Sequence, residues 1–307
     1  MSSVFFQAVA ATIIASSIPL ILAAIGELVA ERSGMLNLGV EGMMLVGAVC
    51  GFIGAYVTGS TLIGALCGVA AGVLMAALFG LLTIGFAVNQ VAAGLALTIF
   101  GQGLSGLIGS RFVGLKRDGA PHLDLPVMSH LPYVGHILFG EDGFVYAAVA
   151  LVAGVAWFLR HSRAGLNLRA VGDNPASAHA LGLPVGRIRL LAVLFGGACA
   201  GLSGAFLTLA YTPFWSPGLS AGRGWIALAL VVFASWKPWR LLLGALLFGG
   251  ATILQLQAQA FGVRLPSQLL SSLPYVVTIL ALILLNLRRN RGSLTPAALG
   301  QSFVADA

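Results

Sequence analysis

Apolar segments about as long as a bilayer is thick recur along the whole of this 307-residue chain. A helix that crosses the hydrocarbon core needs about 20 consecutive, mainly apolar residues. By that rule the sequence predicts about nine spans, in an all-α polytopic bundle that forms a single transmembrane domain over residues 1–307. The predicted spans are residues 4–26, 35–57, 61–88, 91–110, 143–159, 188–211, 223–236, 239–260 and 267–287.

The composition fits lipid rather than water as the solvent. Hydrophobic residues make up 59% of the chain and charged residues only 8%, whereas a soluble domain carries about 25% charged residues. The 41 glycines are typical of membrane helices whose backbones approach closely. The net charge of +7 comes from basic residues at the ends of apolar segments, where they orient a protein in a bilayer. We therefore expect a lipid bilayer, and no nucleic acid, as a partner.

Basic residues gather in the connection 160–187 and in the C-terminal tail. The positive-inside rule places such regions in the cytoplasm. With alternating spans, eleven basic residues then lie inside: Arg32, Arg160, Arg163, Arg169, Arg187, Arg189, Lys237, Arg240, Arg288, Arg289 and Arg291. Five lie outside: Arg111, Lys116, Arg117, Arg223 and Arg264. The C-terminus is thus predicted to be cytoplasmic, with the N-terminus and the loop 111–142 external.

No constellation of residues predicts catalysis. All five histidines fall in polar connections, and the sequence has no H-E-x-x-H pair, no G-x-S-x-G turn and no G-x-x-x-x-G-K-[ST] phosphate loop. Cys50, Cys67 and Cys199 lie inside apolar stretches without metal-ligand spacing, so we interpret them as small buried hydrophobic residues. The sequence therefore predicts no catalytic residue, no metal site and no cofactor bound by this chain.

Two polar residues stand at the start of a strongly apolar stretch. Ionisable side chains inside a membrane are costly, so each one is a functional candidate. Glu41 follows Asn37 by four residues, a spacing that puts both on one face of a helix. Glycines at 34, 39 and 42 allow the backbone to bend. Two interpretations stay open: a broken helix that contacts a transported solute, or side chains that cap and fasten the start of the helix.

Two further pairs are candidates for a solute pathway. Asn89 and Gln90 interrupt a long apolar run, either in the pathway or as a plain turn at the cytoplasmic edge. Phe214 and Trp215 follow Pro213 at the predicted external interface, where most aromatic residues form a belt at the headgroups. Each pair thus has a structural alternative to contact with solute.

A short stretch of the cytoplasmic connection has the start and stop signals of a helix. Asp173 or Asn174 can cap its N-terminus, and Pro175 suits its first turn. Gly182 can end the helix. A rigid two-turn helix on the cytoplasmic face can dock into a groove of a partner, although a simple surface helix carries the same signals.

Five ordered blocks resemble permeases from the nucleoside and simple-sugar branch of bacterial ABC importers, the branched-chain amino acid and ribose type of permease. Residues 31–42 resemble the signature of this family. Its coupling helix is similar to Gly172, Asp173, Asn174, Pro175, Ala178 and Gly182. The other blocks are Asn89-Gln90-Val91 followed by Gly94, residues 221–227, and Leu273-Pro274-Tyr275. The resemblance covers nearly the whole chain.

The resemblance implies the membrane-spanning subunit of an ATP-driven importer for nucleosides or related sugar-like solutes, in a bacterial cytoplasmic (inner) membrane. It implies an ABC ATPase that binds the ATP and Mg²⁺ and engages the coupling helix. It also implies a second permease subunit and an external binding lipoprotein or periplasmic protein. Two alternatives remain: an ion-coupled secondary transporter that works through Glu41 without an ATPase, and an intramembrane enzyme or assembly factor.

Overall fold

The computed structural model describes residues 2–121, 142–260 and 295–304, with eight single residues between 268 and 283. The regular elements of this part are helical, as predicted. The α-helices are α1 (Ser2–Arg32), α2 (Val40–Thr58), α3 (Thr61–Gly80), α4 (Gln90–Gly109), α6 (Gly143–His161), α7 (Arg163–Asp173), α8 (Pro175–Ala180), α9 (Val185–Phe206), α10 (Arg223–Phe233) and α11 (Pro238–Ala260). α3 and α9 end in π-helical turns, Leu81–Gly85 and Leu207–Tyr211, and α4 ends in a 3₁₀ turn, Ser110–Phe112.

Seven of the described helices are long and apolar enough to cross a membrane. The prediction of about nine spans differs from this number at two places. Residues 223–236 form α10, which has only 11 residues; it is about 16 Å long at 1.5 Å per residue, whereas the hydrocarbon core is about 30 Å thick. The segment 267–287 lies mostly outside the described residues.

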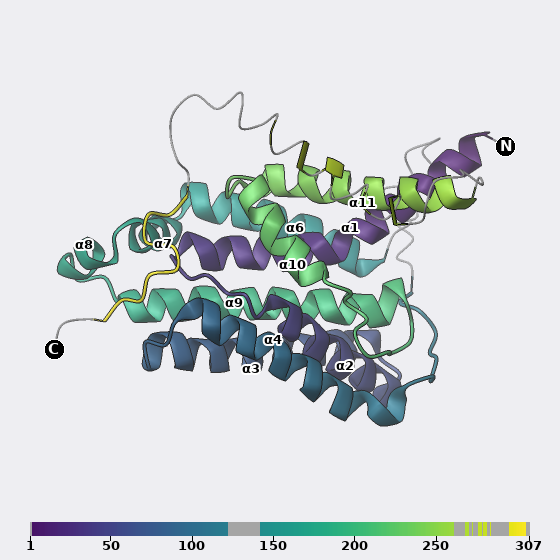
Figure 1. Ribbon diagram of the computed structural model, residues 1–307, viewed down its shortest axis with the longest axis horizontal. Coiled ribbons are helices and arrows are strands. Elements are labelled where there is room, and N and C mark those ends of the chain that lie inside the picture. Colours follow the sequence, from purple (N-terminus) through teal and green to yellow (C-terminus); the bar gives the residue numbers. More distant parts are fainter. Residues whose placement is uncertain are drawn as a thin grey trace.

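Figure 1 shows the long helices lying alongside one another, with α7 and α8 at one end of the molecule and the N-terminus at the other. α9 packs against α1, α2 and α3. The side chains of α1, α2 and α9 supply much of the main buried core. The centre of the bundle is therefore built around a helix that begins shortly after α8.

Glycines bring α2, α3 and α9 into backbone contact. A Cβ added at Gly201 of α9 would overlap the carbonyl oxygen of Gly68 and lie 3.0 Å from the Cα of Gly72, both on α3. A Cβ added at Gly47 of α2 would lie 2.5 Å from the Cα of Gly201. Small residues allow such close approach between membrane helices. Gly201 thus lies at a junction where three helices touch.

α1 and α2 are separated by a linker, residues 33–39, that is not helical. The predicted span 35–57 therefore begins at Val40, and the expectation that Asn37 and Glu41 share a helix face is wrong. Every residue of the linker is buried or half-buried. Non-helical backbone at membrane depth is tolerated only in such surroundings, so the break is a packed feature of the bundle.

The three cysteines are free thiols, with Cys199 buried and Cys50 and Cys67 half-buried. This burial agrees with their interpretation as small apolar residues. Within the described part of the chain, no three His, Cys, Asp or Glu residues come together in a group that could hold a metal ion.

We predict that Gly201→Ala destabilises the protein by about 1–3 kcal/mol, the usual cost of overpacking a tight core. Gly103→Ala on α4 is the matched control, because a Cβ there meets nothing within 4 Å. The midpoint of thermal unfolding of the detergent-purified protein measures the difference. Equal midpoints for the two variants would contradict the close contact of α9 with α3.

Candidate functional site

The carboxylate of Glu41 joins α2 to the start of α10. Its Oε1 accepts hydrogen bonds from the hydroxyl of Ser220 (2.5 Å) and the amide of Gly222 (2.9 Å). Its Oε2 accepts a hydrogen bond from the amide of Gly224 (2.6 Å). The first amides of a helix have no partner within the helix, and negative charge is favourable near its N-terminus. Glu41 therefore caps α10 from a different helix.

α10 begins level with the middle of a neighbouring span. A Cβ added at Gly224 would lie 2.6 Å from the Cα of Glu41, and one added at Gly101 would lie 2.6 Å from the Cα of Gly42. Gly101 lies about halfway along α4. α10 is thus a half-helix whose N-terminus is inside the bundle. Transporters form solute and ion sites at half-helix ends of this kind.

Buried side chains satisfy the backbone of the linker. The amide of Asn37 donates to Oε1 of Glu27 on α1 (3.0 Å). The amide of Leu36 donates to Oε1 of Gln90 at the start of α4 (2.7 Å). The side-chain oxygen of Asn37 accepts a hydrogen bond from the amide of Gly39 (2.9 Å). The linker is therefore held from α1 on one side and from α4 on the other.

A third glutamate fixes the turn between α10 and α11. Oε2 of Glu31 accepts a hydrogen bond from Nε1 of Trp236 (2.6 Å), and Nη2 of Arg32 donates to the carbonyl oxygen of Trp236 (3.1 Å). Trp236 has a φ of +55°, which is costly for a bulky residue. These hydrogen bonds hold the strained turn against the end of α1.

The candidate polar residues take fastening roles in the described structure. The side chains of Asn37 and Glu41 are hydrogen-bonded to protein groups, which is the geometry expected if they fasten the start of a helix. Asn89 caps α4, because its side-chain oxygen accepts a hydrogen bond from the amide of Ala92 (3.1 Å). Gln90 is buried. Contact of these residues with a solute stays a prediction.

Trp215 differs from the expected belt residue. It is fully buried in a cluster with side chains of α2, whereas Phe214 is 37% exposed. Isolated bridges pair Val113 with Trp215 and Lys116 with Phe214, so this segment packs on the chain that opens the predicted external loop. Residues 122–141 of that loop lie outside the described part. Trp215 is thus a core residue, and the belt interpretation is wrong for it.

The predicted cytoplasmic helix is α8, and its caps follow the sequence signals. Of the two predicted caps, Asn174 fills the position, because its side-chain oxygen accepts a hydrogen bond from the amide of Ser177 (2.9 Å). Gly182 has a φ of +82° and donates its amide to the carbonyl oxygen of His179 (2.8 Å). Pro175 occupies the first turn. Both ends of this six-residue helix are therefore fixed by local hydrogen bonds.

α7 rests on the end of α1, and α8 packs on α7 and α9. A Cβ added at Gly172 would overlap the carbonyl oxygen of Arg32 and lie 3.2 Å from the amide nitrogen of Gly34. Ala178 packs in a small buried cluster with side chains of α7 and α9. The end of α7 thus contacts the bundle at the point where α1 gives way to the linker.

Leu181, the residue that follows α8, was not among the predicted site residues. Its side chain is 83% exposed, although its amide is held by the carbonyl oxygen of Ser177 (3.1 Å). Single exposed apolar side chains are common on protein surfaces; this one stands at the end of a capped helix, so its position is fixed. No local pattern separates it from Leu183, two residues later, which packs on a buried cluster.

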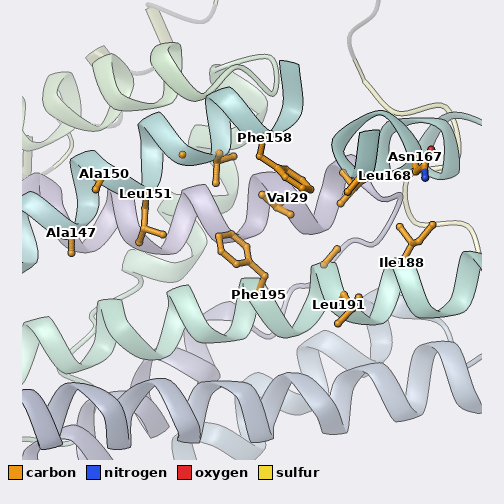
Figure 2. Close-up of a pocket in the computed structure, with 14 residues that line it drawn as sticks. Val29, Ala147, Ala150, Leu151, Phe158, Asn167, Leu168, Ile188, Leu191 and Phe195 are labelled. Atoms are coloured by element: carbon orange, nitrogen blue, oxygen red, sulfur yellow. The ribbon is translucent and has the colours of Figure 1, made fainter. Parts of the chain in front are cut away.

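A groove of about 840 Å³ runs between α1, α6, α7 and α9. Figure 2 shows its walls: Leu151 and Phe158 extend from α6 toward Phe195 of α9, with Val29 of α1 between them and Asn167 of α7 at one end. Its other lining residues are Ala147, Ala150, Gly154, Val155, Ala164, Leu168, Ile188, Leu191 and Ala192. An apolar groove cannot replace the hydrogen bonds of a hydroxyl-rich solute, so it is unsuited to hold one.

We predict that Glu41→Ala lowers the stability of the protein by about 3 kcal/mol or more. Two buried amides and a hydroxyl then lose their acceptor, and each unpaired group costs about 1–3 kcal/mol. Glu41→Gln keeps one acceptor oxygen and should lie in between. Asp118→Asn, at an exposed position, is the control, and the midpoint of thermal unfolding is the measurement. A Glu41→Gln variant with unchanged stability and no transport would instead indicate that the carboxylate of Glu41 contacts the solute.

The chain matches, over residues 9–285, the family described as branched-chain amino acid transport system / permease component. It is 42% identical to the putative glucose ABC transporter permease protein of Haloferax volcanii, with 95% of this chain and 96% of that protein covered. It is 31% identical to the nucleoside ABC transporter permease protein of Lactococcus lactis, with 91% and 92% covered. It is 30% identical to the guanosine ABC transporter permease protein of Bacillus subtilis, with 86% and 87% covered. The chain therefore belongs to this family of permease components, and it is a multi-pass membrane transport subunit rather than an enzyme.

Proposed function

We propose that this chain is the importer subunit through which a cytoplasmic ABC ATPase drives uptake, and that the ATPase docks on α8. The observation that carries the proposal is the geometry of α8, which is capped at both ends, packs on α7 and α9 and displays Leu181. The ATPase binds the ATP and Mg²⁺, because this sequence has no phosphate loop. The C-terminus and α8 then face the cytoplasm, in a bacterial cytoplasmic (inner) membrane.

The docking follows the general rule for a helix that binds in a groove. An apolar anchor on a preformed helix loses little conformational entropy on binding. Gly172, Asp173, Asn174, Pro175, Ala178 and Gly182 fix the shape and the position of this helix. Leu181 supplies the anchor, and Gly172 sets the end of α7, next to α8, against the end of α1.

A second permease subunit, related but not identical, completes the solute pathway. The groove of Figure 2 is apolar, so it does not offer the polar groups that a sugar needs. Asn37 and Glu41 bring polar side chains to the breaks between helices, near the middle of the bundle. We place the pathway at this level, between the two permeases, with Asn89, Gln90, Phe214 and Trp215 supporting its ends. An external binding lipoprotein or periplasmic protein delivers the solute.

The solute is a nucleoside or a related sugar-like compound. Support comes from the relatives, whose names give glucose, nucleosides and guanosine as cargo. The ion-coupled alternative, which works through Glu41, gains no support, because that carboxylate accepts three hydrogen bonds from protein groups.

We predict that Leu181→Asp releases the ATPase and lowers uptake at least tenfold while the protein stays in the membrane. The charged side chain cannot enter an apolar groove. Leu181→Met is the matched control, because it keeps the apolar anchor. Co-purification of the ATPase and uptake of labelled solute are measured together. If Leu181→Asp retained both, α8 would not be the docking helix.

A separate prediction concerns the solute. Cells that lack the transporter and then regain the complete set of subunits should recover uptake of labelled guanosine or of labelled glucose. Competition with unlabelled guanosine, adenosine and glucose separates nucleosides from sugars. The same cells with an ATPase mutated in its phosphate loop are the control, and uptake that persisted in them would contradict ATP-driven import.

A further inference from the structure

Residues 295–304, which we call the clasp, lie against the cytoplasmic helices and the linker at the same time. The amide of Ala298 donates to the carbonyl oxygen of Gly172 at the end of α7 (3.0 Å). The amide of Gly300 donates to the carbonyl oxygen of Gly34 in the linker (3.0 Å). In Figure 1 the clasp is the yellow segment that passes beside α7. Two backbone hydrogen bonds thus join α7 to the linker through the clasp.

Two buried side chains, from α4 and α9, bind the next residue of the clasp, Gln301. The carbonyl oxygen of Gln301 accepts hydrogen bonds from Nη1 of Arg189 (3.0 Å) and Nε2 of Gln90 (3.3 Å). Arg189 also donates through Nε to the carbonyl oxygen of Ser33 (3.3 Å). Gln90 uses its other side-chain atom to hold Leu36. The side chains that hold the clasp are therefore the ones that hold the linker.

The far end of the clasp reaches α8. The ring of Phe303 lies 5.7 Å from the ring of His179, measured between centroids. Phe303 also packs on the cluster that contains Ala178. Ala298 is 4% exposed, so the clasp is seated in the protein and is more than a surface tail. It touches α8, the end of α7 and the linker, along with α4 and α9.

We propose that the clasp transmits the movement of α8 to the linker. It makes α7, α8 and the linker one rigid body, so that a displacement of α8 moves the linker and also Glu41, which follows the linker at the start of α2. This inference rests on the proposed function, because it assumes that the ATPase pushes on α8. Without the clasp, α8 would still bind the ATPase through Leu181. The movement of α8 would then be lost between α7 and the linker, which the hydrogen bonds of the clasp no longer join, and it would not reach α10.

The test compares Ala298→Glu with Ala297→Glu in the complete transporter. Ala298 is buried and Ala297 is exposed, so the same substitution dislodges the clasp only at position 298. For Ala298→Glu we expect retained ATPase binding and hydrolysis with uptake at least tenfold lower, so that the ATP hydrolysed per solute rises about tenfold. Ala297→Glu should match the unmodified protein. Equal uptake by the two variants, or loss of ATPase binding by Ala298→Glu alone, would overturn the proposal.

A second measurement does not depend on dislodging the clasp. His179→Cys and Phe303→Cys are combined and joined by a short bifunctional methanethiosulfonate reagent that a reductant removes. The native cysteines lie in the spans, and each single-cysteine variant with the same reagent is the control. Uptake that is unchanged by the cross-link supports a clasp that stays bound to α8 through the transport cycle. Uptake that falls on cross-linking and returns with reductant overturns the proposal.

The two proposals fail in different ways. If the ATPase does not dock on α8, Leu181→Asp leaves the complex intact. If the clasp does not transmit movement, Leu181→Asp still releases the ATPase, but Ala298→Glu and Ala297→Glu import equally well.

Discussion

A backbone amide that loses its helical partner inside a bilayer has no water to replace it, and each such group costs several kcal/mol. At two breaks between its helices, this chain places a buried glutamate that accepts freed amides. Glu27 accepts the amide of Asn37 in the linker, and Glu41 accepts the amides that begin α10. Glu31 instead accepts the indole N–H of Trp236, in the turn before α11. Acidic side chains therefore stabilise the breaks before α2 and α10.

The same interactions decide where the bundle can move. The glycine junction around Gly201 sets backbone against backbone, so α2, α3 and α9 cannot slide without a clash. The linker and the start of α10 are packed as closely: a Cβ added at Gly94 would lie 2.7 Å from the amide nitrogen of Leu38, and one at Gly224 would lie 2.6 Å from the Cα of Glu41. The breaks are therefore held by both packing and hydrogen bonds, so a movement that reaches the linker carries the start of α10 with it.

Much of this architecture could be predicted from the sequence, because its signals are local. Apolar length predicted seven of the nine expected spans correctly, and Asn174, Pro175 and Gly182 predicted α8 with its caps. The contacts of Glu41 with residues 220–224 are about 180 positions away along the chain, and no local periodicity encodes such a pairing. Asn37 was expected in a helix because its spacing from Glu41 fits one, yet buried hydrogen bonds from α1 and α4 stabilise the extended linker. Trp215 was misjudged because an aromatic residue at an interface and one in a core look alike in sequence.

The clasp could not be predicted for a further reason. Its hydrogen bonds to α7 and the linker are made by backbone amides, which every residue but proline carries. Ala298 is buried and its neighbour Ala297 is exposed, but this difference arises only when the chain folds. Yet the position of the clasp follows from the constraint that governs the bundle. The carbonyl oxygens of Gly34 and Gly172 lie where α1 and α7 end, and unpaired carbonyls at buried helix ends need donors. A segment that supplies those donors from outside both helices joins the two helix ends. The hydrogen bonds that satisfy the carbonyl oxygens of Gly34 and Gly172 are therefore the same ones that, in our proposal, transmit the movement of α8.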